Sequence, residues 1–206
     1  MLVLASSSPR RRELLAQGGF TFEVEPAAIP EELRAGEQAV AYVSRLAREK
    51  AEAVWARFVA RDREDDPLLV VGADTTVVAA DGQILEKPLD AQDAARMLRL
   101  LSGTTHTIVT GVALVSSAAV EVAAEITYVT MLTLSDAEIS EYVASGESMD
   151  KAGAYGIQGR AARWVPRVHG CYFNVMGLPL ALVSSMIEGA RARAARATKT
   201  TLTAAR

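Results

Sequence analysis

The sequence predicts an α/β fold in which a mixed, partly antiparallel sheet is flanked by helices. Two short apolar runs, Leu2–Ala5 and Leu68–Val71, are typical of buried strands, the second of a central strand buried on both faces. Two long β-prone runs, Thr105–Ser116 and Val120–Leu134, follow each other closely and are expected to pair. Helical segments separate the strands without the strict alternation of a Rossmann sheet, which indicates mixed strand directions.

The helices are predicted from their start and stop signals. Ser8 and Pro9 are expected at the N-cap and first position of a helix that runs to Gln17 and stops at Gly18-Gly19. Apolar residues recur at helical spacing from about residue 37 to residue 60, with charges on the other face. Further helices are expected from Asp90 to Leu101, from a capping box at Ser135 to Ala144, and from Pro179 onward.

The connecting segments carry turn and strand signals. Phe20–Glu25 is expected to form a strand, and residues 62–67 a polar loop. The turn Asp81-Gly82, between Thr75–Ala79 and Gln83–Leu85, predicts a β-hairpin. Residues 147–170 are rich in glycine and carry few helix signals.

The composition is that of an ordinary globular protein. Of the 206 residues, 50% are apolar and 23% are charged, which excludes a disordered chain and fits one compact domain or two lobes around a cleft. Cys171 is the single cysteine, so no internal disulfide can form; we expect a cytoplasmic protein in which Cys171 is a packing residue. No secretion signal and no apolar run of 18 residues occurs, so no membrane association is expected.

Charge is spread unevenly along the chain. The net charge is −3, which gives no general attraction to nucleic acid, and none is expected as a partner. Five basic residues and no acidic residue follow Glu188. Residues 191–206 are therefore expected to form a basic, flexible tail, and a basic binding arm is the alternative.

Residues 6–12 form the first candidate for chemistry. Three serines precede Pro9 and three arginines follow it, at the start of the predicted helix. The free N–H groups and positive dipole of a helix N-terminus suit an anion, and hydroxyl and guanidinium groups add donors. The alternative is a capped helix with solvated arginines, and the GxxxxGK[ST] pattern of a Walker loop is absent.

An acidic residue follows the second apolar strand. Asp74 is expected at the carboxyl end of that strand, where α/β proteins place ligands. It could hold a metal or activate a water molecule, and the alternative is a turn aspartate. Lys50 and Lys87 could neutralise phosphate charge or lie on the surface. Gln158, in the glycine-rich segment 150–159, could read the edge of a base, or the segment could be a plain loop.

Two familiar kinds of site find no support in the sequence. His106 and His169 lack neighbouring ligand residues, so a structural zinc site is not expected. No GxSxG pattern supports a serine nucleophile.

Taken together and in this order, the motifs resemble the Maf family of nucleoside triphosphate pyrophosphatases. The matching segments are SSSPRR at 6–11, LAREKA at 46–51, GADT at 72–75, EKP at 86–88, LSG at 101–103, HTIVTGVAL at 106–114, DKAGAYGIQG at 150–159 and NVMGLPL at 174–180. They span most of the chain, and their combination is specific where each alone is weak.

The resemblance implies a single catalytic domain over residues 1–190 with two lobes around a cleft, like that of inosine triphosphate pyrophosphatases. It implies hydrolysis of a nucleoside triphosphate to the monophosphate and pyrophosphate, in a cytoplasmic homodimer. It also implies a divalent metal cation, Mg²⁺ or Mn²⁺, as cofactor.

Residue roles follow from the same resemblance. Asp74 matches the family's proton acceptor, and Glu31 matches an acid that contributes to metal or water binding. The phosphate-binding residues match Ser6, Ser8, Arg11, Lys50 and Lys87.

Three further positions, Arg10, Thr75 and Gln158, match the subgroup that resembles dTTP/UTP pyrophosphatases rather than the 7-methylguanosine triphosphate subgroup. The amide of Gln158 can pair with both the N3–H and the O4 of uracil or thymine, whereas a cationic methylated purine favours an aromatic face.

One segment departs from the family pattern. Ala28-Ile29-Pro30 precedes Glu31, where acidic residues are common in the family. This departure bears on the contribution of the loop to metal or water binding. A second function, a nucleotide-binding regulator of septum formation without turnover, stays open beside the hydrolase. Asp74 together with Lys50 and Lys87 favours the enzyme, because binding alone needs no base.

Overall fold

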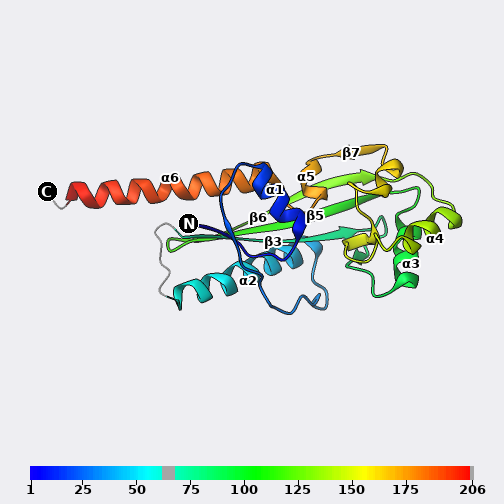
Figure 1. Cartoon of the computed structure of the whole chain (residues 1–206), viewed down its shortest axis with the longest axis horizontal. Helices are drawn as coiled ribbons and strands as arrows, with labels where there is room; N and C mark the ends of the chain where they lie inside the picture. The colour runs from blue at the N-terminus through cyan, green and yellow to red at the C-terminus, as the bar shows by residue number, and fades with distance from the viewer. Residues whose placement is uncertain (62–67, 205–206) are drawn as a thin grey trace.

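The computed structural model describes the backbone of residues 1–61 and 68–204 and the side chains as far as residue 196 (Figure 1). The polar loop predicted at residues 62–67 lies outside the described residues. Within the described part, seven strands form one sheet in the order β2-β1-β3-β5-β6-β7, and β4 pairs with β3. The strands are β1 Leu2–Leu4, β2 Glu23–Val24, β3 Leu69–Val78, β4 Ile84–Leu85, β5 Thr105–Val115, β6 Val120–Thr130 and β7 Arg167–His169.

Strand directions are mixed, as the sequence predicts. Strand β1 is parallel to β2 and β3, whereas the β3–β5, β5–β6, β6–β7 and β3–β4 pairs are antiparallel. The predicted hairpin around Asp81-Gly82 is confirmed, because Val78 pairs with Ile84. The long predicted pair is confirmed as well, with Val109 opposite Ile126.

The position of Asp74 along its strand differs from the prediction. The sequence placed it at a strand end, but β3 continues to Val78, and Asp74 lies in mid-strand opposite Gly111 of β5. The reason is that the parallel partner stops first: β1 ends at Leu4, opposite Val71, while antiparallel pairing with β5 continues. Asp74 therefore lies beyond the carboxyl end of β1, although not beyond that of its own strand.

The helices begin where their caps predict. Ser8, Asp90 and Ser135 each accept a hydrogen bond from the first turn of the helix that follows, and Ser135 forms the predicted capping box. The α-helices are α1 Pro9–Gln17, α2 Ala39–Val59, α3 Ala91–Leu101, α4 Asp136–Ala144, α5 Tyr172–Val175 and α6 Leu180–Ala204. Two 3₁₀ helices, η1 Ala152–Ala154 and η2 Arg160–Trp164, lie in the glycine-rich segment.

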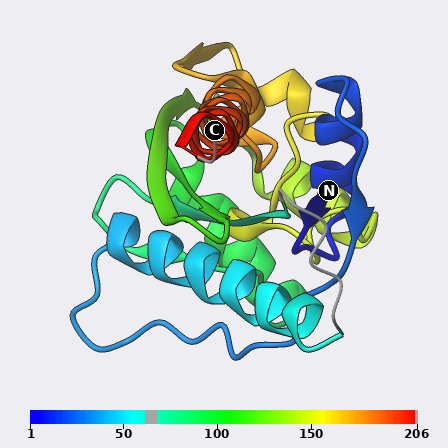
Figure 2. The ribbon, with the colours of Figure 1, turned by 90° about the vertical axis from the view of Figure 1, so that its left-hand side faces the viewer.

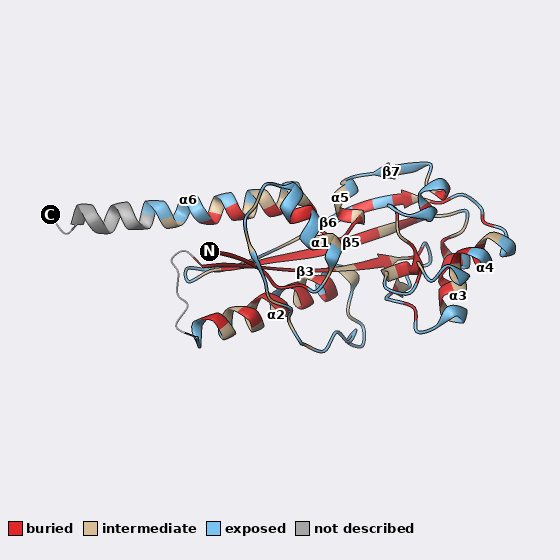
Figure 3. Cartoon of the chain, in the orientation of Figure 1, coloured by how far each residue is buried: buried red, intermediate tan, exposed pale blue. Residues whose placement is uncertain are grey.

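Helices cover both faces of the sheet. Figures 1 and 2 show α2 on one side of the long strands and α6 on the other, and Figure 3 shows β3 and β5 buried between them. On the α2 side, Ala51 and Phe58 pack on Val70 and Ala113. A larger core joins α1, α6, α3 and α4. Helices α3 and α4 gather at one end of the sheet as a second lobe (Figure 1).

Helix α6 continues through most of the segment predicted as a basic tail. It is helical to Ala204, and the Arg193 guanidinium pairs with Glu121 of β6. The flexibility of residues 191–206 stays a prediction. No helix among the described residues has both the length and the apolar character needed to cross a membrane.

Helix α2 lies unusually close to the sheet at two glycines. A Cβ atom built on Gly72 would lie 2.2 Å from the Ala47 carbonyl oxygen, and one on Gly111 would lie 2.4 Å from that of Val43. Real Cβ atoms essentially never make such contacts, so only glycine permits this approach. The side chain of Lys50, on the same stretch of α2, consequently reaches the middle of β3.

Gly72→Ala should lower the free energy of unfolding by about 1–3 kcal/mol, because α2 must move away from β3 to admit a methyl group. Gly189→Ala in α6 is the matched control: its Cβ meets only the flexible end of Arg193, at 3.3 Å. Alanine in a helix interior should stabilise the protein there by about 0.5–1 kcal/mol. Urea denaturation measures both changes, and equal effects would contradict the close-packing interpretation.

Candidate active site

All ten predicted site residues line one cleft of about 770 Å³. Its walls come from the loop between β1 and α1, the middle of β3, helix α2, the hairpin end and the segment 147–159. The predicted residues in the cleft are Ser6, Ser8, Arg10, Arg11, Glu31, Lys50, Asp74, Thr75, Lys87 and Gln158. Positions up to 152 residues apart in sequence, such as Ser6 and Gln158, thus face the same space.

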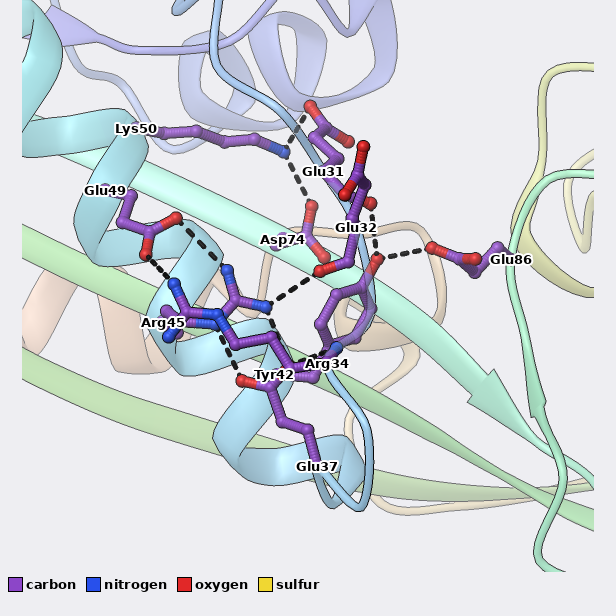
Figure 4. A network of polar contacts seen from close by, with 10 residues as sticks. All are labelled: Glu31, Glu32, Arg34, Glu37, Tyr42, Arg45, Glu49, Lys50, Asp74 and Glu86. Carbon is purple, nitrogen blue, oxygen red and sulfur yellow. Dashed lines mark hydrogen bonds and ion pairs between the residues drawn. The ribbon is translucent and has the colours of Figure 1, made fainter.

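A buried lysine joins two carboxylates at the floor of the cleft. The Lys50 ammonium lies 2.6 Å from Asp74 Oδ1 and 2.8 Å from Glu31 Oε1 (Figure 4). Lys50 and Asp74 are 5% and 7% exposed, whereas the side chain of Glu31 is half exposed. Burial raises the pKa of Asp74, and the cations of Lys50 and Arg11 oppose that rise. The pair therefore keeps a carboxylate that is poorly solvated and accessible from the cleft.

Arg11, on helix α1, is hydrogen-bonded both to strand β3 and to the turn at Gly177 before helix α6. Its Nε donates to the Gly177 carbonyl oxygen at 2.8 Å, and its Nη2 donates to Thr75 Oγ1 at 3.1 Å. Its Nη1 also lies 3.5 Å from Ser6 Oγ. Burial lowers the pKa of Arg11, while Asp74 and Glu31 act in the opposite direction. A guanidinium stays protonated in proteins, so Arg11 supplies a fixed positive charge in the cleft.

The N-terminus of α1 opens on the same cleft. Ser8 caps this helix by accepting from the Arg11 N–H at 3.5 Å, and the Ser8 N–H donates to Ser6 Oγ at 3.2 Å. The helix dipole and the hydroxyl groups favour an anion here. Lys87 is exposed on the opposite wall, with no ion pair among the described residues, so its charge is available to a ligand.

The loop that carries Glu31 is fastened to helix α2. The Tyr42 hydroxyl donates to Glu86 Oε1 at 2.5 Å and lies 3.0 Å from the Glu31 carbonyl oxygen. Burial, followed by the neighbouring Glu86, raises the pKa of Tyr42, so it stays a donor. Arg45 holds both Glu37 carboxylate oxygens at 2.7 Å and also donates to the Glu32 carbonyl oxygen (Figure 4).

The three base-selecting candidates lie on different elements around the cleft. Arg10 Nη1 donates to Asp150 Oδ2 at 2.9 Å, which ties α1 to the glycine-rich segment across the cleft. Gln158 is exposed on that segment. Thr75 lies on β3, and its hydroxyl oxygen is 2.9 Å from the hydroxyl oxygen of Thr110 on the neighbouring strand β5.

Sequence reasoning missed several residues that shape this site. Tyr42, Glu86, Glu147 and Asp150 line the cleft, yet none was assigned a role. Tyr42 carried one weak signal: it lies eight residues before Lys50 and so shares its face of the helix. The other three act through tertiary contacts that leave no local pattern.

The carboxylates provide a limited set of metal ligands. Among the described residues, no three histidine, cysteine, aspartate or glutamate side chains form a group that could hold a metal. Glu31 and Asp74 nevertheless direct oxygens to one point, at Lys50 Nζ. Mg²⁺ is commonly bound by one or two carboxylates together with substrate phosphates. The Lys50 ammonium occupies the point where these two oxygens meet, so a cation shared with a phosphate ligand would be held by the remaining oxygen atoms of Glu31 and Asp74.

Comparison with known proteins identifies the family of the chain. A model of the family described as Maf-like protein matches residues 1–190, and the chain belongs to this family, as its motifs predict.

Curated relatives match over nearly the whole chain. The chain is 52% identical over 189 residues to the dTTP/UTP pyrophosphatase of Koribacter versatilis (strain Ellin345), covering 92% of this chain and 94% of the relative. It is 55% identical over 179 residues to the dTTP/UTP pyrophosphatase of Salmonella typhimurium, covering 87% of each. That of Chromobacterium violaceum is 52% identical over 179 residues, covering 87% of this chain and 89% of the relative.

Lys50→Met should lower the free energy of unfolding by about 3–5 kcal/mol, because the buried Asp74 carboxylate loses its cation. Adding Asp74→Asn should recover most of that loss, since no carboxylate then stays buried beside the lost ammonium. Lys87→Met, an exposed lysine of the same cleft, is the control and should change stability by no more than about 0.5 kcal/mol. Chemical denaturation at neutral pH compares the four proteins; a mild effect of Lys50→Met would contradict the buried pair.

Proposed function

We propose that this protein hydrolyses nucleoside triphosphates, dTTP and UTP foremost, to the monophosphate and pyrophosphate. The observation that carries the proposal is the buried Lys50–Asp74 pair in one cleft with Arg11 and the N-terminus of α1. A carboxylate for the water and positive groups for the phosphates are what this hydrolysis needs. The names of the relatives from three bacteria support the choice of dTTP and UTP.

The proposed reaction is attack of water on the α-phosphorus. The Asp74 carboxylate accepts a proton from the water as its oxygen bonds to phosphorus. The bond between the α-phosphorus and the bridging oxygen to the β-phosphate breaks, and pyrophosphate leaves with that oxygen. Arg11, Lys87, Ser6, Ser8 and the N–H groups of α1 bind the triphosphate, and Lys50 orients Asp74 and Glu31.

A divalent cation, Mg²⁺ or Mn²⁺, belongs to this proposal. Asp74 and Glu31 would hold it together with the phosphates. When bound, it would neutralise phosphate charge and favour the departure of pyrophosphate. A cytoplasmic location and a homodimer are proposed on the family resemblance alone.

Base selection is assigned to Arg10, Thr75 and Gln158. The Gln158 amide offers one donor and one acceptor, which match the O4 and N3–H of uracil and thymine. A site that hydrogen-bonds its substrate rejects an analogue that leaves those groups unpaired. No observation favours the alternative of a regulator without turnover.

Pyrophosphate release should be fastest with dTTP and UTP when compared with CTP, GTP and 7-methylguanosine triphosphate. Gln158→Glu should narrow that lead, because a carboxylate replaces the amide donor and repels the base carbonyl groups. Preference for the methylated purine would refute the subgroup assignment. Binding of all five without any turnover would instead indicate the regulator.

Asp74→Asn should reduce kcat by at least about 10²-fold, the scale of general base catalysis, while the protein still binds nucleotide. Asn keeps the size of the side chain and loses its capacity to accept a proton. Asp136→Asn is the control, because Asp136 is exposed and pairs with Arg99 on the second lobe. Near-normal turnover of the Asp74→Asn enzyme would eliminate Asp74 as the base.

A further inference from the structure

The loop that presents Gln158 is anchored from behind at two backbone amides. The Gly156 N–H donates to the Tyr142 hydroxyl at 3.1 Å, and the Arg160 N–H donates to Glu147 Oε2 at 3.3 Å. Gln158 lies midway between them, two residues from each. Its side chain is exposed on the wall of the cleft, and Gly156, Gly159 and Glu147 line the same wall.

The two anchors are joined into one unit. The Tyr142 hydroxyl donates to Glu147 Oε1 at 3.0 Å, so the phenol accepts a hydrogen bond from the loop and donates one to the carboxylate that holds the loop's other end. Tyr142 is 1% exposed, and its ring meets that of Trp164 edge-on at 5.1 Å. Burial raises the pKa of Tyr142, which keeps its hydroxyl protonated. The Tyr142 part of the anchor therefore belongs to helix α4 and is packed into the hydrophobic core.

The glycines of the loop fit this anchor. A Cβ atom on Gly159 would lie 1.8 Å from Glu147 Oε1, and one on Gly156 would lie 2.6 Å from Lys151 Cε. Lys151 in turn donates to the Glu147 carbonyl oxygen at 2.7 Å. The backbone on each side of Gln158 thus lies directly against these side chains, with no room for the loop to settle closer.

We propose that Glu147 and Tyr142 are positioning residues for base selection, which fix loop 156–160 so that the Gln158 amide meets the pyrimidine edge. The inference rests on the proposed function. Its physical basis is that a donor and an acceptor discriminate between bases only when both are held in place, and small displacements of such groups are costly. Neither residue contacts the reacting phosphates in this scheme.

The test is the ratio of kcat/KM for dTTP to that for CTP in Tyr142→Phe and Glu147→Gln, because cytosine reverses the donor and acceptor that thymine offers. Tyr142→Phe removes the acceptor for the Gly156 N–H, and Glu147→Gln leaves one oxygen for the two donors that the carboxylate binds. We expect the ratio to fall about 10-fold, roughly the worth of one hydrogen bond, while kcat/KM for CTP changes less than about 2-fold. In a Gln158→Ala background, Glu147→Gln should have little further effect, because there is no amide left to position.

Glu141→Gln is the matched control. Glu141 lies on helix α4, next to Tyr142, and pairs with the side chain of Arg160, whereas Glu147 accepts from the Arg160 backbone N–H. It should leave the ratio unchanged. A ratio that stays at the wild-type value in both anchor variants would overturn the proposal, as would an equal loss for dTTP and CTP.

Failure of the proposed function gives a different result. If the wild-type protein hydrolyses none of the nucleotides, the same ratio is measured from the Kd values of the α,β-imido analogues of dTTP and CTP. A narrowed binding ratio in the variants then supports the positioning role, and an unchanged one refutes it. Thermal unfolding identifies a variant that no longer folds. If the buried Tyr142→Phe variant does not fold, the result for Glu147→Gln, whose side chain is partly exposed, decides the proposal by itself.

Discussion

The contact between helix α2 and the middle of the sheet is the constraint on which the cleft depends. Because Gly72 and Gly111 have no side chains, the helix backbone rests on β3 and β5, and Lys50 extends to Asp74 at 2.6 Å. A carboxylate buried this deeply needs a cation beside it. The position of helix α2, which carries Lys50, therefore determines whether Asp74 can stay ionised. The same helix then fastens the Glu31 loop, through Tyr42 and Arg45.

The proposed roles are spread over several elements of the cleft. The β1–α1 loop and the start of α1 supply hydroxyl, N–H and guanidinium groups proposed to bind phosphates, whereas the segment 147–159 supplies Gln158, one of the three residues proposed to read a base. Arg10 and Asp150 join the walls at 2.9 Å. This exposed ion pair adds little to stability, but it links helix α1 to the segment that carries Gln158.

Local signals predicted most of the fold and part of the site. Caps at Ser8, Asp90 and Ser135 fixed three helix starts, because capping is decided within one turn. The mid-strand position of Asp74 was not predictable, since it depends on how early β1 stops beside β3. Likewise, the network through Tyr42 and the anchor at Glu147 arise from side chains that meet only after folding, and the spacing of Tyr42 from Lys50 on one helix is the one weak signal of either.

The residues proposed for phosphate binding and for base reading share one set of hydrogen bonds at Thr75. Arg11 is bound at its Nε by the Gly177 carbonyl oxygen and at its Nη2 by Thr75, whose hydroxyl also meets Thr110. Gly177 adopts a φ of +101°, and a Cβ there would lie 3.3 Å from Thr75 Oγ1, so a side chain would strain the turn and crowd the hydroxyl. Because Thr75 and Gly177 each accept a hydrogen bond from the guanidinium, the position of its charge depends on the residue at 75. A substitution at Thr75 would therefore change the proposed base-reading group and also shift the charge proposed to bind the triphosphate, so the two effects cannot be separated by changing that residue alone.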